Sequence, residues 1–484
     1  MRKQSIILSI FILLGMSLQA QYQVDALRYS RLDHGGTARS VSLGGAFGAL
    51  GGDISTLSTN PAGIGLYRSS EVVFTPTFRF GSANSQYYGD KSTEYYANAS
   101  IDNFGMVLAL KPTGNSIMER IQIGFGINRI ADFSNKIGPS TVNNVQSRAN
   151  YYSSQAQGLD PVSLEDEFKL AWDTYLIDTI GTNNHYYSDL QNGVYQKNIY
   201  KTYGEIDEVV ISGGANISDR LYLGVTFGFP KLEYHQENLF LESDRNEESE
   251  FFSDFKLSDE YSAVGRGINA KIGVIGRPLN WLRLGAAYHS PTVYSNIQEQ
   301  WSTSMTTNFD QQVDGYTTYT SSLPNGSYNY KLVTPARYIG SAAFLIGKLG
   351  LLSIEYEHVD YTKARLEPFS ENPLDDFSLD NETIESSYRS VGNIKAGAEV
   401  RLGAMSVRGG FAFYPSPYKE GVNDHAVTSY SAGLGYRGES FFADFAYVYS
   451  ASEDSFYTSN PVLFEPSQNT YHKSQILMTF GLRF

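Results

Sequence analysis

Apolar and polar side chains alternate along the C-terminal stretch SQILMTFGLRF, from Ser474 to Phe484. One face of a strand over this stretch would carry Ile476, Met478, Phe480, Leu482 and Phe484. The other face would carry Gln475, Thr479, Gly481 and Arg483, with Leu477 as its one apolar member. An apolar face towards lipid and a small or polar face towards a lumen is the pattern of outer-membrane β-barrels. The stretch therefore predicts a strand of an all-β, transmembrane, antiparallel barrel.

The same alternation recurs upstream and predicts about 14 strands. It is clear in residues 387–401, where Ile394, Ala396 and Ala398 share one face while Lys395 and Glu399 share the other. The predicted strands are 70–80, 102–111, 121–133, 203–217, 220–240, 254–277, 281–301, 328–347, 350–364, 387–401, 404–414, 424–437, 440–452 and 471–484.

The lengths of the connections between these strands alternate as well. Counted from the first strand, the even-numbered connections are short and the odd-numbered ones are long, beginning with 81–101 and 134–202. Short periplasmic turns and long extracellular loops are the habit of such barrels. This arrangement would place both the N-terminal segment and Phe484 on the periplasmic side.

Composition bears on three questions, namely cysteine chemistry, nucleic-acid binding and export. The chain has no cysteine, which excludes disulfides, thiolate metal sites and a cysteine nucleophile. Its formal charge of −14 makes it a poor candidate for binding nucleic acid. Residues 1–20 read as a signal peptide, with Arg2 and Lys3 before an apolar run and a cleavage site at Ala20, so we expect export.

Residues 21–69 lack strand alternation and are rich in glycine. Small residues allow close packing of backbone on backbone, as in a plug that fills a barrel. Asp53 offers a helix N-cap, and we expect Asn60 and Pro61 to end that helix. The chain is thus divided into a signal peptide (1–20), an N-terminal plug (21–69) and a barrel with long extracellular loops (70–484).

The stretch ARSVSLGGAFGALGGDISTLSTNPAGI, within residues 38–64, resembles the N-terminal hatch of the FadL family of outer-membrane transporters for long-chain fatty acids and other hydrophobic compounds. The elements that match are a Gly-Gly-Ala-Phe step, an acidic residue that starts a short helix, and Asn-Pro-Ala-Gly. The residues that the resemblance assigns to a hatch or gate are Gly44, Gly45, Phe47, Asp53, Asn60, Pro61, Ala62 and Gly63.

The resemblance implies a fourteen-stranded barrel that its hatch closes. It also implies that the ligand enters among the outer loops and leaves sideways into the membrane, through a gap at a kink in the third strand. In this chain Gly124 and Gly126 lie in that strand, and they are the residues we expect to permit the kink.

The longest connection, 134–202, carries a predicted helix. Asp160 and Pro161 form its expected start, and one helix face would hold Leu164, Phe168, Trp172 and Tyr175. This face either packs on other loops as a roof for the barrel or captures a hydrophobic ligand, and the sequence leaves both interpretations open.

Four basic residues are predicted to face the lumen: Arg283, Lys395, Arg401 and Arg408. They either pair with lumen carboxylates or form a basic patch for a ligand carboxylate, and the cost of an unpaired buried charge favours pairing. The seven histidines show no metal-ligand spacing, and no nucleophile motif is present. We therefore expect no metal, no cofactor and no enzymatic activity.

The leading hypothesis for function is passive transport of a small hydrophobic compound, such as a long-chain fatty acid, through a hatch-gated barrel with a lateral exit. Its partners would be that ligand and the lipid of a Gram-negative outer membrane. The second hypothesis is a non-transporting barrel that docks a partner protein through its outer loops. A gap beside the third strand would favour the first hypothesis.

Overall fold

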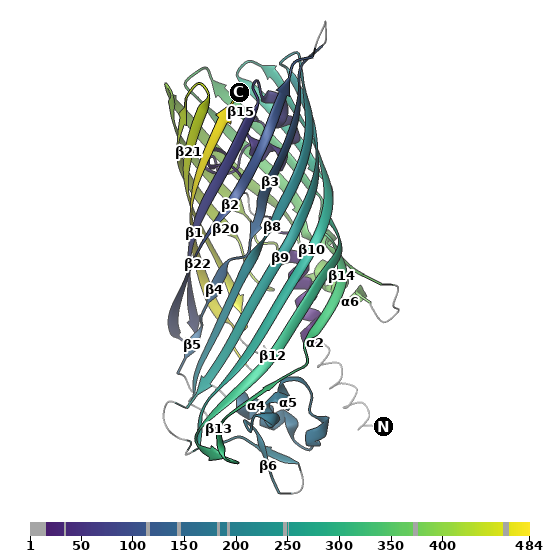
Figure 1. The fold of residues 1–484 in the computed structure, drawn as a ribbon, viewed down its shortest axis with the longest axis vertical. Coiled ribbons are helices and arrows are strands. Elements are labelled where there is room, and N and C mark those ends of the chain that lie inside the picture. Colours follow the sequence, from purple (N-terminus) through teal and green to yellow (C-terminus); the bar gives the residue numbers. More distant parts are fainter. Residues whose placement is uncertain are drawn as a thin grey trace.

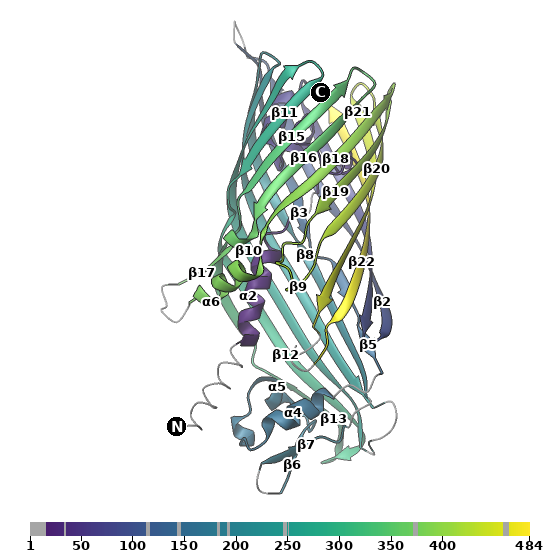
Figure 2. The same ribbon diagram turned by 180° about the vertical axis from the view of Figure 1, so that it is seen from behind.

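The chain folds as one closed, elongated β-barrel with an N-terminal segment inside it (Figures 1 and 2). The computed structural model describes residues 16–32, 35–112, 117–142, 147–181, 184–190, 194–244, 249, 251–370, 376–457 and 464–484. No helix in these ranges is both long and apolar enough to cross a bilayer. Residues 1–15 of the predicted signal peptide lie outside the described residues.

Fourteen spans make up the barrel wall, each antiparallel to its neighbours. Ten spans are single strands: β1 (Glu71–Tyr87), β2 (Asp90–Leu110), β8 (Tyr195–Ile217), β9 (Leu221–Ser243), β10 (Phe252–Leu279), β18 (Ser390–Leu402), β19 (Met405–Tyr414), β20 (Val427–Arg437), β21 (Phe441–Phe456) and β22 (Ser467–Arg483). Pairing of β22 with β1 closes the ring, so the fold class predicted from the sequence is confirmed.

The other four spans are interrupted strands. The third consists of β3 (Met118–Asp132), β4 (Asn135–Ile137) and β5 (Ser140–Thr141). The seventh consists of β11 (Leu282–His289) and β12 (Val293–Val313), the eighth of β14 (Gly326–Val333) and β15 (Arg337–Ile346), and the ninth of β16 (Gly350–Asp360) and β17 (Arg365–Pro368). The strand β13 (Tyr316–Ser322) extends a hairpin from β12.

Towards the end that holds the short turns, alternate residues of the spans face outwards and are mostly apolar, whereas nearer the loops exposed residues such as Lys201 and Glu260 are charged. In β3, for example, Ile121, Ile123, Phe125 and Ile127 are each about two-fifths exposed, and the residues between them face the lumen. An exposed apolar surface on this scale would be unstable in water but is what contact with lipid requires. The last span follows the predicted pattern, since Phe480, Leu482 and Phe484 are exposed while Leu477 and Thr479 are buried.

The helical elements lie inside the barrel or at its loop end. Those of the N-terminal segment are α2 (Met16–Arg28), α3 (Ala38–Val41) and the 3₁₀ helices η1 (Ile54–Leu57) and η2 (Pro61–Leu66). At the loop end lie α4 (Arg148–Ala156), η3 (Pro161–Ser163), α5 (Asp166–Asp173), η4 (Tyr361–Lys363), α6 (Ser378–Ser387) and the small hairpin of β6 (Asp178–Ile180) and β7 (His185–Tyr187).

Two predictions about the connections need correction. The stretch 81–101 is not a loop, because β1 and β2 continue to a tight turn at Tyr88 and Gly89. The N-terminal segment does not lie wholly at the end that holds Phe484 and the short turns. Its helix α2 lies in the other half of the barrel beside α6, with the Tyr388 hydroxyl donating to the Gln23 carbonyl at 2.9 Å (Figure 2).

Candidate functional site

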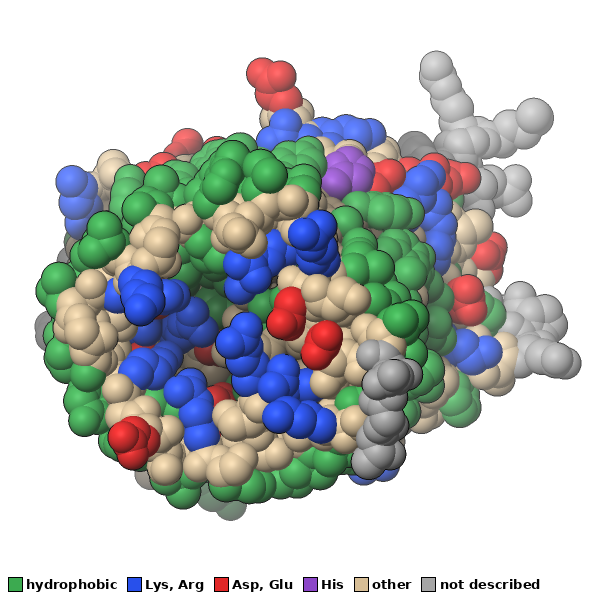
Figure 3. Space-filling model, turned by 90° about the horizontal axis from the view of Figure 1, so that it is seen from above, with side chains coloured by type: hydrophobic (Ala, Val, Ile, Leu, Met, Phe, Trp, Pro, Cys, Tyr) green, Lys and Arg blue, Asp and Glu red, His purple; other side chains and the backbone are tan. Residues whose placement is uncertain are grey.

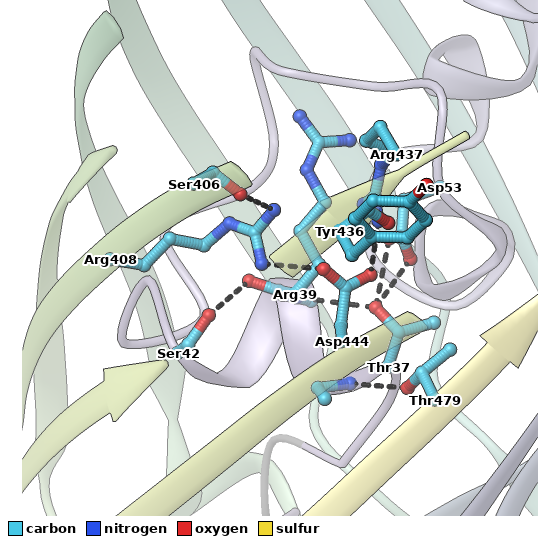
Figure 4. Close-up of polar contacts among 12 residues, drawn as sticks. Thr37, Arg39, Ser42, Asp53, Ser406, Arg408, Tyr436, Arg437, Asp444 and Thr479 are labelled. Atoms are coloured by element: carbon cyan, nitrogen blue, oxygen red, sulfur yellow. Dashed lines mark hydrogen bonds and ion pairs between the residues drawn. The ribbon is translucent and has the colours of Figure 1, made fainter. Parts of the chain in front are cut away.

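Residues 35–69 of the N-terminal segment fill the lumen between α2 and the end that holds Phe484. Many polar contacts join this stretch to the wall (Figure 4). The Ala38 amide donates to the Thr479 hydroxyl at 2.7 Å, and the Arg39 guanidinium lies 3.5 Å from the Glu399 carboxylate. Burial opposes the charge on Arg39, but the carboxylates around it still raise its pKa. The stretch is therefore held by directed bonds as well as by packing.

The glycines predicted for the hatch meet two needs. Gly44 and Gly45 have φ of 65° and 75°, a conformation that residues with a side chain rarely adopt. A Cβ added to Gly44 would lie 2.5 Å from the Phe411 carbonyl oxygen of the wall. Phe47, three residues on, is fully buried. This part of the chain thus requires glycine both for its turns and for its closeness to the wall.

Asp53 and Asn60 each cap a short 3₁₀ helix. The Asp53 carboxylate accepts from the Ser55 amide at 3.0 Å and from the Thr37 hydroxyl at 2.8 Å. Asn60 was predicted to end a helix with Pro61, but it begins the second helix, η2, with Pro61 in the first position. Its side chain accepts from the Ala62 amide at 3.1 Å and donates to the Gly48 carbonyl at 2.6 Å. Gly63 follows within the same helix.

A cavity of about 730 Å³ occupies the lumen between α2 and the wall. Its lining combines aromatic rings with charged groups, and it includes Leu27, Arg31, Phe133, Tyr200, Tyr234, Tyr414, Tyr418, Phe456, Tyr471 and Lys473. On one side it reaches Arg79 and Tyr96 of the first two strands and Asp132 of the third span. A volume and a lining of this kind suit a small molecule with a largely apolar body.

The backbone ladder between the second and third spans stops beside this cavity. Pairing of β2 with β3 runs from Leu110 and Ile121 only as far as Asn103 and Asn128. Beyond that point β2 still pairs with β1 as far as Asp90, and the third span still pairs with β8 as far as Thr141. We call the facing stretches that lack this pairing, residues 90–102 of the second span and 129–141 of the third, the ladder break.

Side chains bridge the ladder break instead of backbone. Asn98 donates to the Ser134 hydroxyl at 2.6 Å, and the Lys136 ammonium lies 2.7 Å from the Glu94 carboxylate. Ile137 of β4 packs on Ala83 and Tyr471, which face the lumen from β1 and β22. The third span therefore bends inwards beyond the end of the ladder.

Gly124 and Gly126, the residues expected to permit a kink in the third strand, do not lie at the ladder break. Both glycines lie in regular register with β2 and β8. Beyond both glycines, the pairing with β8 shifts between Arg129 and Ala131, and β3 ends at Asp132. The sequence signal that was missed is Gly138-Pro139, because proline cannot donate to a ladder and interrupts a strand.

The four apolar residues predicted in the longest loop lie against a core of that loop. Leu164 is buried, and Phe168 and Trp172 are partly buried on the same cluster. The Tyr175 ring packs on Tyr319 with centroids 4.7 Å apart. Asp160 and Pro161 start the 3₁₀ helix η3 rather than the α-helix, which begins at Asp166. In this arrangement the face serves as a packing surface.

Three of the four predicted lumen cations have carboxylate partners. The Lys395 ammonium lies 2.9 Å from Glu355 and 3.1 Å from Glu357, and all three side chains are buried. Arg408 contacts Glu399 and Asp444, each at 2.7 Å, and Arg401 contacts Glu399 at the same distance. Arg283 is the exception, since it donates to the Leu50 carbonyl of the N-terminal segment at 2.6 Å.

No protein-family model matches the sequence, and no curated protein matches it. Solved structures do match. A FadL homologue of Pseudomonas aeruginosa is 11% identical, with a TM-score of 0.57 over 94% of this chain and 99% of its own. The toluene transporter TbuX of Ralstonia pickettii is 15% identical, with a TM-score of 0.52 over 93% of this chain and 99% of its own.

The chain has the fold of the FadL channels. The toluene transporter TodX of Pseudomonas putida matches in the same way, at 9% identity and a TM-score of 0.56, over 93% of this chain and 99% of its own. TbuX and TodX are both described as toluene transporters. In the described part of the chain, no group of three or more histidine or acidic side chains is arranged to hold a metal ion.

Proposed function

We propose that the protein carries a small hydrophobic compound passively across the outer membrane of a Gram-negative bacterium, after export by its signal peptide. The observation that carries this proposal is the lumen cavity that reaches the ladder break. Transfer of a hydrophobic compound from water into lipid lowers its free energy, so a passive route through the wall needs no energy source.

In this proposal residues 21–69 act as the hatch, and the ladder break is the lateral exit. Backbone pairing is absent there, so only side-chain contacts such as Asn98 with Ser134 need to open. Elsewhere in a barrel wall, an opening would expose unpaired backbone groups to hydrocarbon, which costs several kcal/mol for each group. The break is therefore the place where a compound can leave at the lowest cost.

The ligand we propose has an apolar or aromatic body and one polar end. The rings in the cavity, among them Phe133, Tyr234 and Tyr471, would contact the body. The basic groups that share the lining, such as Arg31 and Lys473, would lie close to the polar end. A barrel that only docks a partner protein has no need for such a cavity, so this second hypothesis receives no support from it.

Filling the cavity tests the proposal. Ser452 lines the cavity, and the variant Ser452→Trp should occupy part of it. We expect that apolar molecules which co-purify with the protein, measured by mass spectrometry, decrease severalfold in this variant. The matched control is Ser258→Trp on β10, outside the cavity lining. Equal amounts of co-purified molecules in the folded wild type and Ser452→Trp would contradict the proposal.

A further inference from the structure

Arg283 lies inside the barrel at the end that holds the short turns, without a carboxylate partner. Its Nη1 donates to the Leu50 carbonyl at 2.6 Å. Among the described residues it forms no ion pair, and its Nε is buried without a hydrogen bond. A guanidinium that is partly withdrawn from water without a counter-ion is destabilising, and a bound anion would relieve that cost.

The charges that act on Arg283 increase the cost. Burial disfavours the charged guanidinium most, and the cations Arg277, Arg39 and Arg401 add to this, while Tyr222 acts in the opposite sense. Arg277 lies on β10 at about the level of Arg283 on the paired strand β11, since Gly276 faces Leu284 and Leu279 faces Leu282. Like charges opposite one another on paired strands are destabilising. The Arg277 Nε is also buried without a hydrogen bond.

The surroundings carry a surplus of positive charge. Seen from this end, lysine and arginine side chains gather around a hollow in the mouth of the barrel (Figure 3). Within the described residues, those near this end that form no ion pair include Arg68, Arg220, Arg277, Arg283 and Lys348. This local surplus contrasts with a chain whose net charge is −14.

We propose that Arg277 and Arg283 form a binding site for an anionic group, a carboxylate or a phosphate, at the mouth of the barrel beneath Leu50. A guanidinium presents its N–H donors in a planar fork that matches both groups. The bond to Leu50 holds the Arg283 side chain in place before the anion arrives, which lowers the entropic cost of binding. The anion balances two like charges that the protein leaves unpaired.

The site is separate from the cavity at the ladder break, because neither arginine lines that cavity. The proposal therefore does not depend on which compound the cavity holds. Binding at Arg283 would also act on the hatch through Leu50. Two sources can supply the group, namely a soluble periplasmic anion and the headgroup of an anionic phospholipid.

Calorimetric titration of the full-length protein in non-ionic detergent tests the site, with citrate and inorganic phosphate as probes at constant ionic strength. We expect saturable binding that Arg283→Gln and Arg277→Gln each weaken about tenfold or more, because hydrogen bonds to charged groups are strong. Lys348→Gln is the control, since it removes one charge from an exposed turn at the same end. It should change the affinity less than threefold.

A second arm separates the two sources of the anion. The same proteins are placed in nanodiscs of phosphatidylcholine with or without phosphatidylglycerol. The lipid that each protein retains is then identified by mass spectrometry. Loss of phosphatidylglycerol from Arg283→Gln, without citrate or phosphate binding in detergent, assigns the site to a lipid headgroup. Arg283→Lys, which keeps the charge, should recover part of the binding and so distinguishes a lost site from a lost fold. Equal binding of every probe by wild type and Arg283→Gln overturns the proposal.

Discussion

Single residues in the lumen are fixed by partners that lie far away in the sequence. Lys395 is fully buried and contacts two glutamates of β16, while Glu355 also accepts from the Gly48 amide at 2.8 Å. A carboxylate that contacts both a wall lysine and the N-terminal segment connects the two parts of the molecule. The apolar–polar alternation predicts that these side chains face the lumen. It does not predict which charged side chains pair, because that depends on the register of neighbouring strands.

Removal of the lysine at the centre of this group should be costly. Lys395→Ala leaves the buried Glu355 without its lysine counter-ion, while Glu357 keeps Arg337, and we expect a loss of about 3–5 kcal/mol in the free energy of unfolding. Urea titration of the refolded barrel measures this loss. The exposed pair of Lys201 and Glu237 supplies the control, because Lys201→Ala should cost less than about 1 kcal/mol. A loss below 1 kcal/mol for Lys395→Ala would show that the group is not a buried network.

Elements were predictable where lipid imposes a pattern on them. The C-terminal strand was found from its apolar face. The sequence predicts a loop for the outer parts of β1 and β2, although both strands continue to Tyr87 and from Asp90. These parts carry polar residues such as Ser85 and Ser92 and lack a continuous apolar row, so the two-residue period has no physical cause there.

The short helices of the N-terminal segment show a different limit. The sequence indicated Asp53 as a cap, and the structure agrees. The end of η1 was placed at Asn60 and Pro61, although proline also fits the first position of a new helix. The contact of the Asn60 side chain with the Ala62 amide shows that this proline takes the first position of η2.

Asn60→Ala should loosen this element without preventing barrel assembly. The change removes the cap of η2 and the bond to Gly48, and loss of a cap alone costs about 1 kcal/mol. We expect faster amide hydrogen exchange in residues 48–66 and lower uptake of a hydrophobic probe. The shift of the folded band in unheated electrophoresis should remain. Unchanged exchange and uptake in the folded variant would contradict a role of Asn60 in the gate.

At the scale of the whole molecule, the account joins three features: a closed ring of strands, an N-terminal segment inside it and one break in the ladder. The ring follows from alternation, and the presence of a small-residue plug follows from the glycine-rich stretch. Gly138-Pro139 marks an interruption of the third span, but alternation alone does not show that this span and β2 stay paired to their other neighbours while their pairing with each other ends. Such a loss is a property of the closed ring and not of any one strand.

A disulfide across the ladder break is the most direct test of the proposed exit. Because the chain has no cysteine, the double variant Asn98→Cys with Ser134→Cys would form a single disulfide across the break. The control is Thr306→Cys with Thr320→Cys, a pair between strands β12 and β13. Transfer of a fluorescent hydrophobic probe into proteoliposome lipid is then measured before and after reduction. We predict that the oxidised Asn98–Ser134 pair blocks transfer, that reduction restores it, and that the control pair has no effect. Equal transfer by the oxidised and reduced forms of the Asn98–Ser134 pair would contradict a lateral exit at this place.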